Sequence, residues 1–277
     1  MQRFWPSVIE PICREAHVQS FVEIGIGSGL LTRQLISYAK TSGGHVHAID
    51  PHPSCDLSAF TAEGTDVLRI HTIPSLEILP QLSAETVLID GDHNWYTVFH
   101  ELKAIGAWKE SPLIFLHDTE WPYGRRDMYY DPHRIPKHAR HPCGKSGIAR
   151  GSSELLGQGG LNPHLYNAEK EGGPRNGVRT AIEDFLKGSG RRWHAQFCSG
   201  LFGLGILVPQ DVLSRKPVFA RMLADLQTSA LLQRYIEHLE VQRFWEYQRR
   251  CTLEKLLVER TAYNETAMSF EADADSA

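Results

Sequence analysis

The sequence predicts a doubly wound α/β fold, in which helices cover both faces of a mostly parallel sheet. Short apolar runs recur along the first 118 residues, and stretches with helical spacing separate several of them. A glycine-rich segment follows the first of these runs. Parallel strands that are buried on both faces form continuous apolar runs of this kind, so these features together favour the α/β class.

The expected elements can be placed in chain order from their apolar patterns. Five apolar runs are the expected parallel strands, at 21–24, 45–50, 67–70, 86–90 and 113–116. Helical spacing is found at 30–40, 98–108 and 177–188. Two further runs flank a Ser-Gly turn and predict an antiparallel hairpin that closes the sheet, at 193–197 and 204–208.

Length and composition disfavour several classes of protein. With 277 residues, of which 42% are hydrophobic and 22% charged, the chain can bury a full-sized core without disulfides or metal staples. Its net charge of −4 disfavours a dedicated nucleic-acid binder. No apolar run reaches the roughly 18 residues that a membrane span requires. The charged, proline-containing N-terminal segment and five scattered cysteines predict a cytoplasmic protein.

The patterns also predict how the chain is divided. Residues 1–210 are the expected main domain, and its segment 119–177, rich in Gly, Pro, Tyr, Arg and His, is the expected lid or substrate-binding insertion. Residues 211–265 are an expected helical extension, whose long helix, about 218–264, carries a thin apolar stripe. This helix either pairs with a second copy in a homo-oligomer or packs on its own sheet. The acidic segment 266–277 is an expected flexible tail.

A glycine-rich loop lies between the first expected strand and the first expected helix. Gly25, Gly27 and Gly29 form a GxGxG pattern, and Glu23 lies two residues before it. Glycines let the backbone turn sharply and approach a ligand closely, and the helix N-terminus beyond offers free N–H groups. Asp50 ends the second expected strand, where a carboxylate can accept hydrogen bonds from both hydroxyls of a ribose. The third glycine of the GxGxxG dinucleotide fingerprint is missing.

This segment resembles motifs I and II of the class I S-adenosylmethionine-dependent methyltransferases. The resemblance covers about residues 20–118 and resumes at the 193–208 hairpin. It implies a Rossmann-like fold in which Glu23 and the three glycines belong to the S-adenosyl-L-methionine site. It also implies that Asp50 binds the ribose of this cofactor, and that Ser75, just after the third strand, contacts its adenine side.

Acidic residues and histidines follow the fourth and fifth expected strands. Asp90, Asp92 and His93 follow the fourth strand, and His117 and Asp118 end the fifth. Because the carboxyl ends of adjacent parallel strands face the same crevice, we expect these side chains to lie close together. An oxygen-rich set of this kind suits Mg²⁺, and a softer ion such as Mn²⁺ could also use the histidine.

The IDGDH sequence and the later His-Asp pair are similar to the methyltransferase subgroup that includes macrocin-type sugar O-methyltransferases and cephalosporin hydroxylase-like proteins. This resemblance implies that Asp90, His117 and Asp118 hold a divalent cation. The chain departs from the metal enzymes at His117, where they usually have Asp or Glu. An alternative therefore stays open, in which Asp90 and His93 contact the cofactor and the acceptor and His117 is a base that works without metal.

Methylation of a hydroxyl requires a group that removes its proton, and a histidine titrates near neutral pH. His93 is the first candidate for this catalytic base, and His117 is the second. The insertion leaves the fifth strand directly above the expected site. Its Trp121 and Tyr123 could stack on a flat or sugar-like acceptor, and Arg125 could bind an acidic group, so all three are candidate substrate-binding residues.

These features predict an enzyme that methylates a small-molecule acceptor with S-adenosyl-L-methionine. The expected acceptor atom is a hydroxyl oxygen of a sugar, a phenol or a natural-product intermediate, with or without help from a divalent cation. Two alternatives remain open, an NAD(P)-dependent oxidoreductase and a non-catalytic methyltransferase-like domain that binds a partner through its long helix. Neither a membrane nor nucleic acid is an expected partner.

Overall fold

The structure of the protein is a computed structural model, and it describes residues 1–60 and 66–274. Its central sheet has seven strands in the order β3-β2-β1-β4-β5-β10-β9. The five parallel strands are β1 (Ser20–Ile24), β2 (His45–Ile49), β3 (Leu68–His71), β4 (Thr86–Ile89) and β5 (Leu113–His117). The hairpin consists of β9 (Trp193–Cys198) and β10 (Leu204–Pro209), and β10 runs antiparallel to both β9 and β5. The predicted fold class and the closing hairpin are therefore confirmed.

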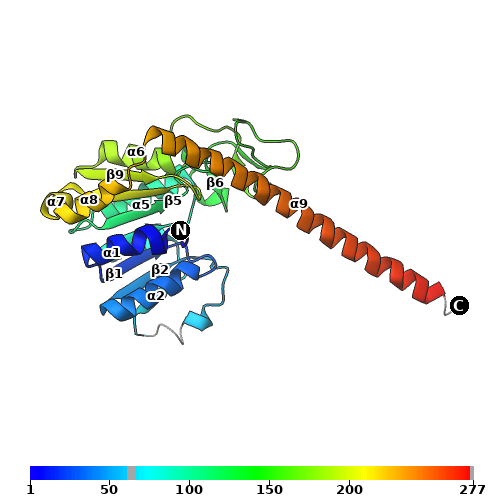
Figure 1. Ribbon diagram of the computed structural model, residues 1–277, viewed down its shortest axis with the longest axis horizontal. Coiled ribbons are helices and arrows are strands. Elements are labelled where there is room, and N and C mark those ends of the chain that lie inside the picture. The colour runs from blue at the N-terminus through cyan, green and yellow to red at the C-terminus, as the bar shows by residue number, and fades with distance from the viewer. Residues whose placement is uncertain (61–65, 275–277) are drawn as a thin grey trace. The chain divides into compact units, whose positions relative to one another are not determined.

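Helices cover both faces of this sheet, as the labelled elements in Figure 1 show. One face packs against α1 (Glu10–Ala16), α2 (Leu30–Ser42) and α8 (Pro217–Asp225). The other face packs against α5 (Trp95–Gly106), α6 (Val178–Gly188) and the short η2 turn (Leu79–Gln81), which follows α4 (Ser75–Ile78). Alternate residues of the central strands enter the two cores, which explains why these strands form continuous apolar runs.

The insertion contains a second, smaller sheet that the sequence patterns did not predict. Its three antiparallel strands lie in the order β6-β8-β7. They are β6 (Met128–Tyr129), β7 (Cys143–Lys145) and β8 (Tyr166–Ala168), accompanied by the 3₁₀ turns η3 (Pro132–Arg134) and η4 (Lys137–Ala139). Strands of two or three residues are too short to produce a detectable alternation of apolar and polar residues.

Two buried charged residues organise the insertion: Arg126 joins segments within it, and Asp127 attaches it to the rest of the domain. The Arg126 side chain is fully buried and donates hydrogen bonds to the carbonyl oxygens of Ala168 and Ser153, at 2.5 and 2.8 Å. The neighbouring Asp127 carboxylate accepts from the backbone N–H groups of Trp95 (2.7 Å) and Gly177 (2.6 Å). Since Trp95 begins α5 and Gly177 precedes α6, Asp127 ties the insertion to two helices that cover the sheet.

Shorter elements complete the chain at its two ends. A π-helical turn, η1 (Trp5–Ile9), precedes α1, and α7 (Gln210–Arg215) precedes α8. The helical stretch expected at about 218–264 is wrong in its continuity, because residues 226–229 separate α8 from α9 (Ala230–Ala274). Thr228 and Ser229 lie in this break, and both residue types favour helix ends over helix interiors.

The chain divides into two compact units, residues 1–230 and 231–277. The second unit consists of nearly all of α9, and within it Arg243 forms an ion pair with Glu240 at 2.7 Å. The last three residues of the expected tail, 275–277, lie outside the described residues. No helix in the described part of the chain combines the length and the apolar character that crossing a membrane requires.

Candidate active site

The glycine-rich loop connects β1 to α2, and its backbone adopts conformations that favour glycine. Gly25, Gly27 and Gly29 have φ values of +93°, +52° and +75°. A Cβ atom at Gly25 would lie 2.3 Å from the backbone oxygen of Asp90, so the loop passes directly over the end of β4. A Cβ atom at Gly27 would meet no atom within 4 Å, which leaves space for a ligand beside the described part of this loop.

Asp50 lies at the carboxyl end of β2, where it contacts the glycine loop directly. Its Oδ2 atom accepts hydrogen bonds from the backbone N–H groups of Ile26 (2.9 Å) and Gly27 (3.1 Å). Its Oδ1 atom accepts from the N–H group of His52 at 2.8 Å. The structure thus brings together the loop glycines and the acid that the resemblance assigns to one nucleoside site.

Two buried glutamates lie close to the candidate site. Glu23 on β1 is 1% exposed, and burial raises the pKa of its carboxyl group to about 8, against the opposing effect of the Thr32 hydroxyl. Glu101 on α5 is also 1% exposed, and burial raises its pKa to about 8 although the Ser75 hydroxyl donates to its Oε1 atom at 2.5 Å. Ser75, expected beside the adenine, is therefore in direct contact with an acid that the sequence analysis missed.

The side chains that follow β4 and β5 form one compact cluster, as expected. His93 Nε2 lies 2.9 Å from Asp118 Oδ2 and 3.8 Å from Asp90 Oδ1. His117 Nδ1 lies 2.8 Å from the same Asp118 oxygen and 3.1 Å from Asp90 Oδ1. Asp118 has a φ of +58°, a strained conformation for a residue with a side chain and one that is common at functional sites. Two carboxylates and two imidazoles therefore share a single network.

The charges of this cluster stabilise one another. Burial opposes ionisation of His117, but Asp90 and then Asp118 raise the pKa of its imidazole to about 9. Burial likewise opposes the charge on His93, and Asp118 raises its pKa well above the ordinary value. Burial alone would raise the pKa of both carboxyl groups, yet the two imidazoles hold the pKa of Asp118 below its ordinary value, and His117 does the same for Asp90.

Asp90, His117 and Asp118 form a group whose donor atoms could hold a divalent cation. One potential ligand atom from each residue lies within 4.8 Å of the others. The carboxylate oxygens suit a hard cation, and the imidazole nitrogen adds affinity for softer ones such as Mn²⁺. Since Nε2 of His117 faces the carbonyl oxygen of Leu201 at 3.0 Å, this ring has an outer partner of the kind that metal-bound histidines use.

The three candidate substrate-binding residues lie in different surroundings. Tyr123 is 4% exposed and stacks on His93, with 5.5 Å between ring centroids. The Trp121 ring lies under the Arg150 guanidinium, 6.0 Å away. Arg125 forms a bidentate ion pair with Glu183 on α6, with both distances 2.7 Å. The structure therefore brings Tyr123 to the cluster and directs the Arg125 side chain to α6.

Other residues of the site were not predicted from the sequence. The Tyr130 ring, 6.2 Å from that of His93, adds a second aromatic side chain at this position. The α-ammonium group of Met1 lies 2.5 Å from Asp90 Oδ2, and the Phe4 ring meets His117 edge-on at 6.0 Å. Neither contact has a local sequence signal, because both join segments that are far apart in the chain. The signal for Glu101 was present, since an acid on the apolar face of a predicted helix is unusual.

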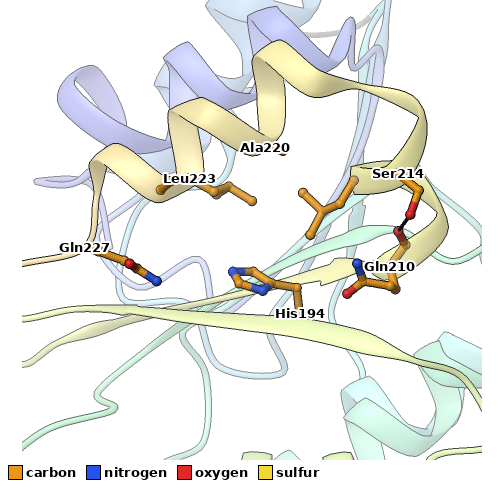
Figure 2. Close-up of a pocket in the computed structure, with 8 residues that line it drawn as sticks. His194, Gln210, Ser214, Ala220, Leu223 and Gln227 are labelled. Carbon is orange, nitrogen blue, oxygen red and sulfur yellow. Dashed lines mark hydrogen bonds between the residues drawn. The ribbon is translucent and has the colours of Figure 1, made fainter.

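A pocket of about 250 Å³ lies elsewhere on the first unit, between the start of β9 and helices α7 and α8. Figure 2 shows His194, Gln210 and Gln227 around it. In the sheet register His194 pairs with Val208, four residues along β10 from the residue that pairs with His117. A strand rises about 3.3 Å per residue, so this pocket and the carboxylate–imidazole cluster lie at opposite edges of the sheet.

A comparison with protein families matches the part of the chain that carries this site. Residues 22–119 match a family model described as a methyltransferase domain. This range contains the glycine loop, Asp50, Ser75 and the whole carboxylate–imidazole cluster. A comparison with curated protein sequences gave no match. The family match favours the expected methyltransferase over the oxidoreductase and the non-catalytic alternative.

A comparison with solved structures gives matches that include three methyltransferases. One is the S-adenosylhomocysteine-bound Podospora anserina methyltransferase PaMTH1, at 14% identity and a TM-score of 0.45, with coverage of 71% of this chain and 74% of the other. Another is the Burkholderia thailandensis 1,6-didemethyltoxoflavin-N1-methyltransferase, at 13% identity and 0.42, covering 72% and 75%. A third is CalS10, an amino pentose methyltransferase from Micromonospora echinaspora, at 11% and 0.40, covering 72% and 86%. Similarity at this level supports no inference about the acceptor.

Proposed function

We propose that this chain is a class I S-adenosylmethionine-dependent methyltransferase that methylates a hydroxyl group of a small molecule with His93 as the catalytic base. The observation that carries the proposal is the difference between the surroundings of the two ring nitrogens of His93. Its Nε2 atom lies 2.9 Å from the Asp118 carboxylate, while its buried Nδ1 atom has no hydrogen-bond partner among the described residues. In its neutral form, a histidine whose Nε2–H group faces a carboxylate has an unprotonated Nδ1 atom that can accept a proton from an acceptor hydroxyl. Because Asp118, against the effect of burial, raises the pKa of His93, we expect the activity to increase with pH as this neutral form becomes populated.

The glycine loop and Asp50 support the binding of S-adenosyl-L-methionine. The open space beside Gly27 would let a ligand approach the backbone closely, and Asp50 lies next to it. The cofactor supplies a methyl group that its sulfonium already activates, so the protein needs only to orient the acceptor and remove its proton. Ser75 and Glu101 are proposed to contact its adenine side, and Glu23 to lie beneath the loop.

Asp90, His117 and Asp118 are the residues that would hold a divalent cation. When bound, such a cation would supply positive charge that lowers the pKa of an acceptor hydroxyl. The proposal about His93 does not depend on this cation, because the Asp118 carboxylate orients the ring directly. The aromatic rings of Tyr123 and Tyr130 flank His93, which favours a flat or sugar-like acceptor.

The first test is calorimetric titration of S-adenosyl-L-methionine, S-adenosylhomocysteine and NADPH into the purified protein, with and without Mg²⁺. We expect the first two to bind and NADPH not to bind. Asp50→Ala is expected to weaken the affinity for S-adenosyl-L-methionine at least tenfold. Asp56→Ala, an exposed acid in the same segment, is the matched control and is expected to change nothing. Binding of NADPH alone would overturn the proposal.

The acceptor atom is tested separately, with the radiolabelled methyl group of the cofactor and a panel of phenols, sugars and amines. We expect label to appear on hydroxyl-bearing compounds and its transfer to depend on His93. Labelling of amines alone would contradict O-methylation while leaving the methyltransferase assignment intact. A cytoplasmic location and a homo-oligomer formed through α9 stay predictions.

A further inference from the structure

The turn between β9 and β10 has an unusual backbone conformation. Four consecutive residues have positive φ values, namely 92° at Gly200, 49° at Leu201, 74° at Phe202 and 84° at Gly203. Glycine adopts this region readily, but Leu201 and Phe202 are strained in it. Strain of this kind persists only where surrounding contacts impose it, and it occurs often at functional sites.

Glu120, three residues after the end of β5, imposes this conformation. Its Oε1 atom accepts a hydrogen bond from the Ser199 hydroxyl (2.6 Å), and its Oε2 atom accepts from the Gly200 N–H group (3.2 Å). Its own N–H group donates to the Phe202 carbonyl oxygen at 2.8 Å. A Cβ atom at Gly203 would lie 2.6 Å from the Glu120 Cγ atom, so the turn and this side chain are in close contact.

This turn contacts the carboxylate–imidazole cluster through the carbonyl oxygen of Leu201. The Leu201 carbonyl oxygen lies 3.0 Å from His117 Nε2, and the Phe202 ring meets the His117 ring edge-on at 6.0 Å. A carbonyl oxygen can only accept, so Nε2 of His117 carries a proton. The other nitrogen, Nδ1, then faces Asp90 and Asp118.

We propose that Glu120 is a positioning residue that holds the 199–203 turn, so that the Leu201 carbonyl fixes the orientation of the His117 ring. Without this contact the ring could rotate by about 180° about its Cβ–Cγ bond, which would exchange nitrogen and carbon positions at the cluster. The inference deepens the proposed function, because it concerns a residue of the same site. It predicts that a side chain outside the cluster controls which atom His117 presents to Asp90 and Asp118.

The chemistry of Glu120 explains why a carboxylate is needed here. It accepts from two donors at once, one with each oxygen. Glutamine in its place has one acceptor oxygen, and its amide group would face one of the two donors with hydrogen atoms. Aspartate keeps both acceptors but is one methylene shorter. Glu120→Gln and Glu120→Asp are therefore expected to weaken the turn, and Glu120→Ala is expected to release it.

The test follows the Nε2–H proton of His117 by ¹H–¹⁵N NMR in protein labelled with ¹⁵N-histidine. A proton held by a carbonyl oxygen should exchange slowly and give a resolved signal, which is assigned by its loss in His117→Asn. We expect exchange with water to be at least tenfold faster in Glu120→Ala, with smaller increases in the Gln and Asp variants. In a methyl-transfer assay the same variants should lower kcat more than they weaken cofactor binding.

Glu85→Gln is the matched control. Glu85 Oε2 also accepts from backbone N–H groups, those of Gln19 (2.7 Å) and Ser20 (2.9 Å), but at the opposite edge of the sheet. Its substitution should leave the His117 signal unchanged. If Glu120→Ala does not fold, Glu120→Gln carries the test. Unchanged exchange in the folded Glu120 variants, an equal change in Glu85→Gln, or no slow proton in the unsubstituted protein would overturn the inference.

This readout requires neither cofactor nor acceptor. A signal that responds to Glu120 in a protein that binds no S-adenosyl-L-methionine would uphold the positioning role and overturn the proposed function. Cofactor binding together with a His117 signal that does not change in the Glu120 variants would uphold the proposed function and overturn the positioning role.

Discussion

The stability of the Glu101→Gln variant, measured relative to the unsubstituted protein, is expected to be higher at alkaline pH than at acid pH. Glu101 is 1% exposed, and burial raises the pKa of its carboxyl group from 4.5 to about 8. In the unfolded chain the group loses its proton near its ordinary pKa. Between these two values the folded state holds a proton that the unfolded state has released, so the contribution of Glu101 to the free energy of unfolding falls as pH rises.

The size of this effect follows from the difference in pKa. Each unit corresponds to about 1.4 kcal/mol, so the full penalty above pH 8 is on the order of 5 kcal/mol. Below about pH 4.5 it vanishes. Glutamine does not titrate, and its side-chain oxygen can still accept the hydrogen bond that Ser75 donates to Glu101 at 2.5 Å. The buried amide group has a fixed desolvation cost of about 1–3 kcal/mol, which does not vary with pH.

The measurement is urea unfolding followed by tryptophan fluorescence at several pH values between 5 and 9, without cofactor. We expect the stability of Glu101→Gln, relative to the unsubstituted protein, to increase by several kcal/mol across this range, because all other groups titrate in both proteins. Glu77→Gln, an exposed glutamate on α4, is the control and should show a constant difference. A constant difference for Glu101→Gln as well would refute the argument from burial.

Three further predictions concern the loop, the base and the insertion. Gly25→Ala should lower the Tm and abolish S-adenosyl-L-methionine binding in calorimetry, because its Cβ would lie 2.3 Å from the Asp90 backbone oxygen. Gly27→Ala should lower the Tm less, because a Cβ at Gly27 meets open space. Equal losses of Tm in the two variants would contradict the argument from close contact at Gly25. His93→Gln should reduce kcat by about 10²–10⁴ in the methyl-transfer assay with little change in cofactor affinity, whereas unchanged kcat would exclude it as the base. Arg126→Met should remove buried hydrogen bonds that join distant segments within the insertion, so amide hydrogen exchange should accelerate within 119–177 and stay slow in the central sheet. Unchanged exchange within 119–177 would contradict this role.

The sequence predicted the sheet and the cluster because both depend on local patterns and one topological rule. The apolar runs identified the five parallel strands and the hairpin. The rule that parallel strands direct their carboxyl ends to one crevice then placed Asp90 beside Asp118. The distances of 2.8 to 3.8 Å between these acids and the imidazoles of His93 and His117 agree with that expectation.

The contacts that could not be predicted join residues without a shared local pattern. Leu201 reaches His117 only because the hairpin folds back beside β5, and Tyr130 reaches His93 only through the arrangement of the insertion. The break between α8 and α9 was missed because helical spacing on both sides hides a four-residue interruption. The apolar spacing identified residues that favour a helix. It contained no information about the position at which one helix ends and the next begins.

The insertion is fixed to helices α5 and α6 by the buried Asp127, and this affects how the acceptor is selected. Asp127 accepts from the backbone N–H groups of Trp95 and Gly177, so displacing the insertion would leave a buried carboxylate and two helix ends without their partners. Tyr123 lies within this anchored part and stacks on His93. The wall of the proposed acceptor site is therefore held in place before any ligand binds. Selectivity for the acceptor should accordingly depend on the shape of this wall, and substitutions at Tyr123 should change which acceptors react more than they change cofactor affinity.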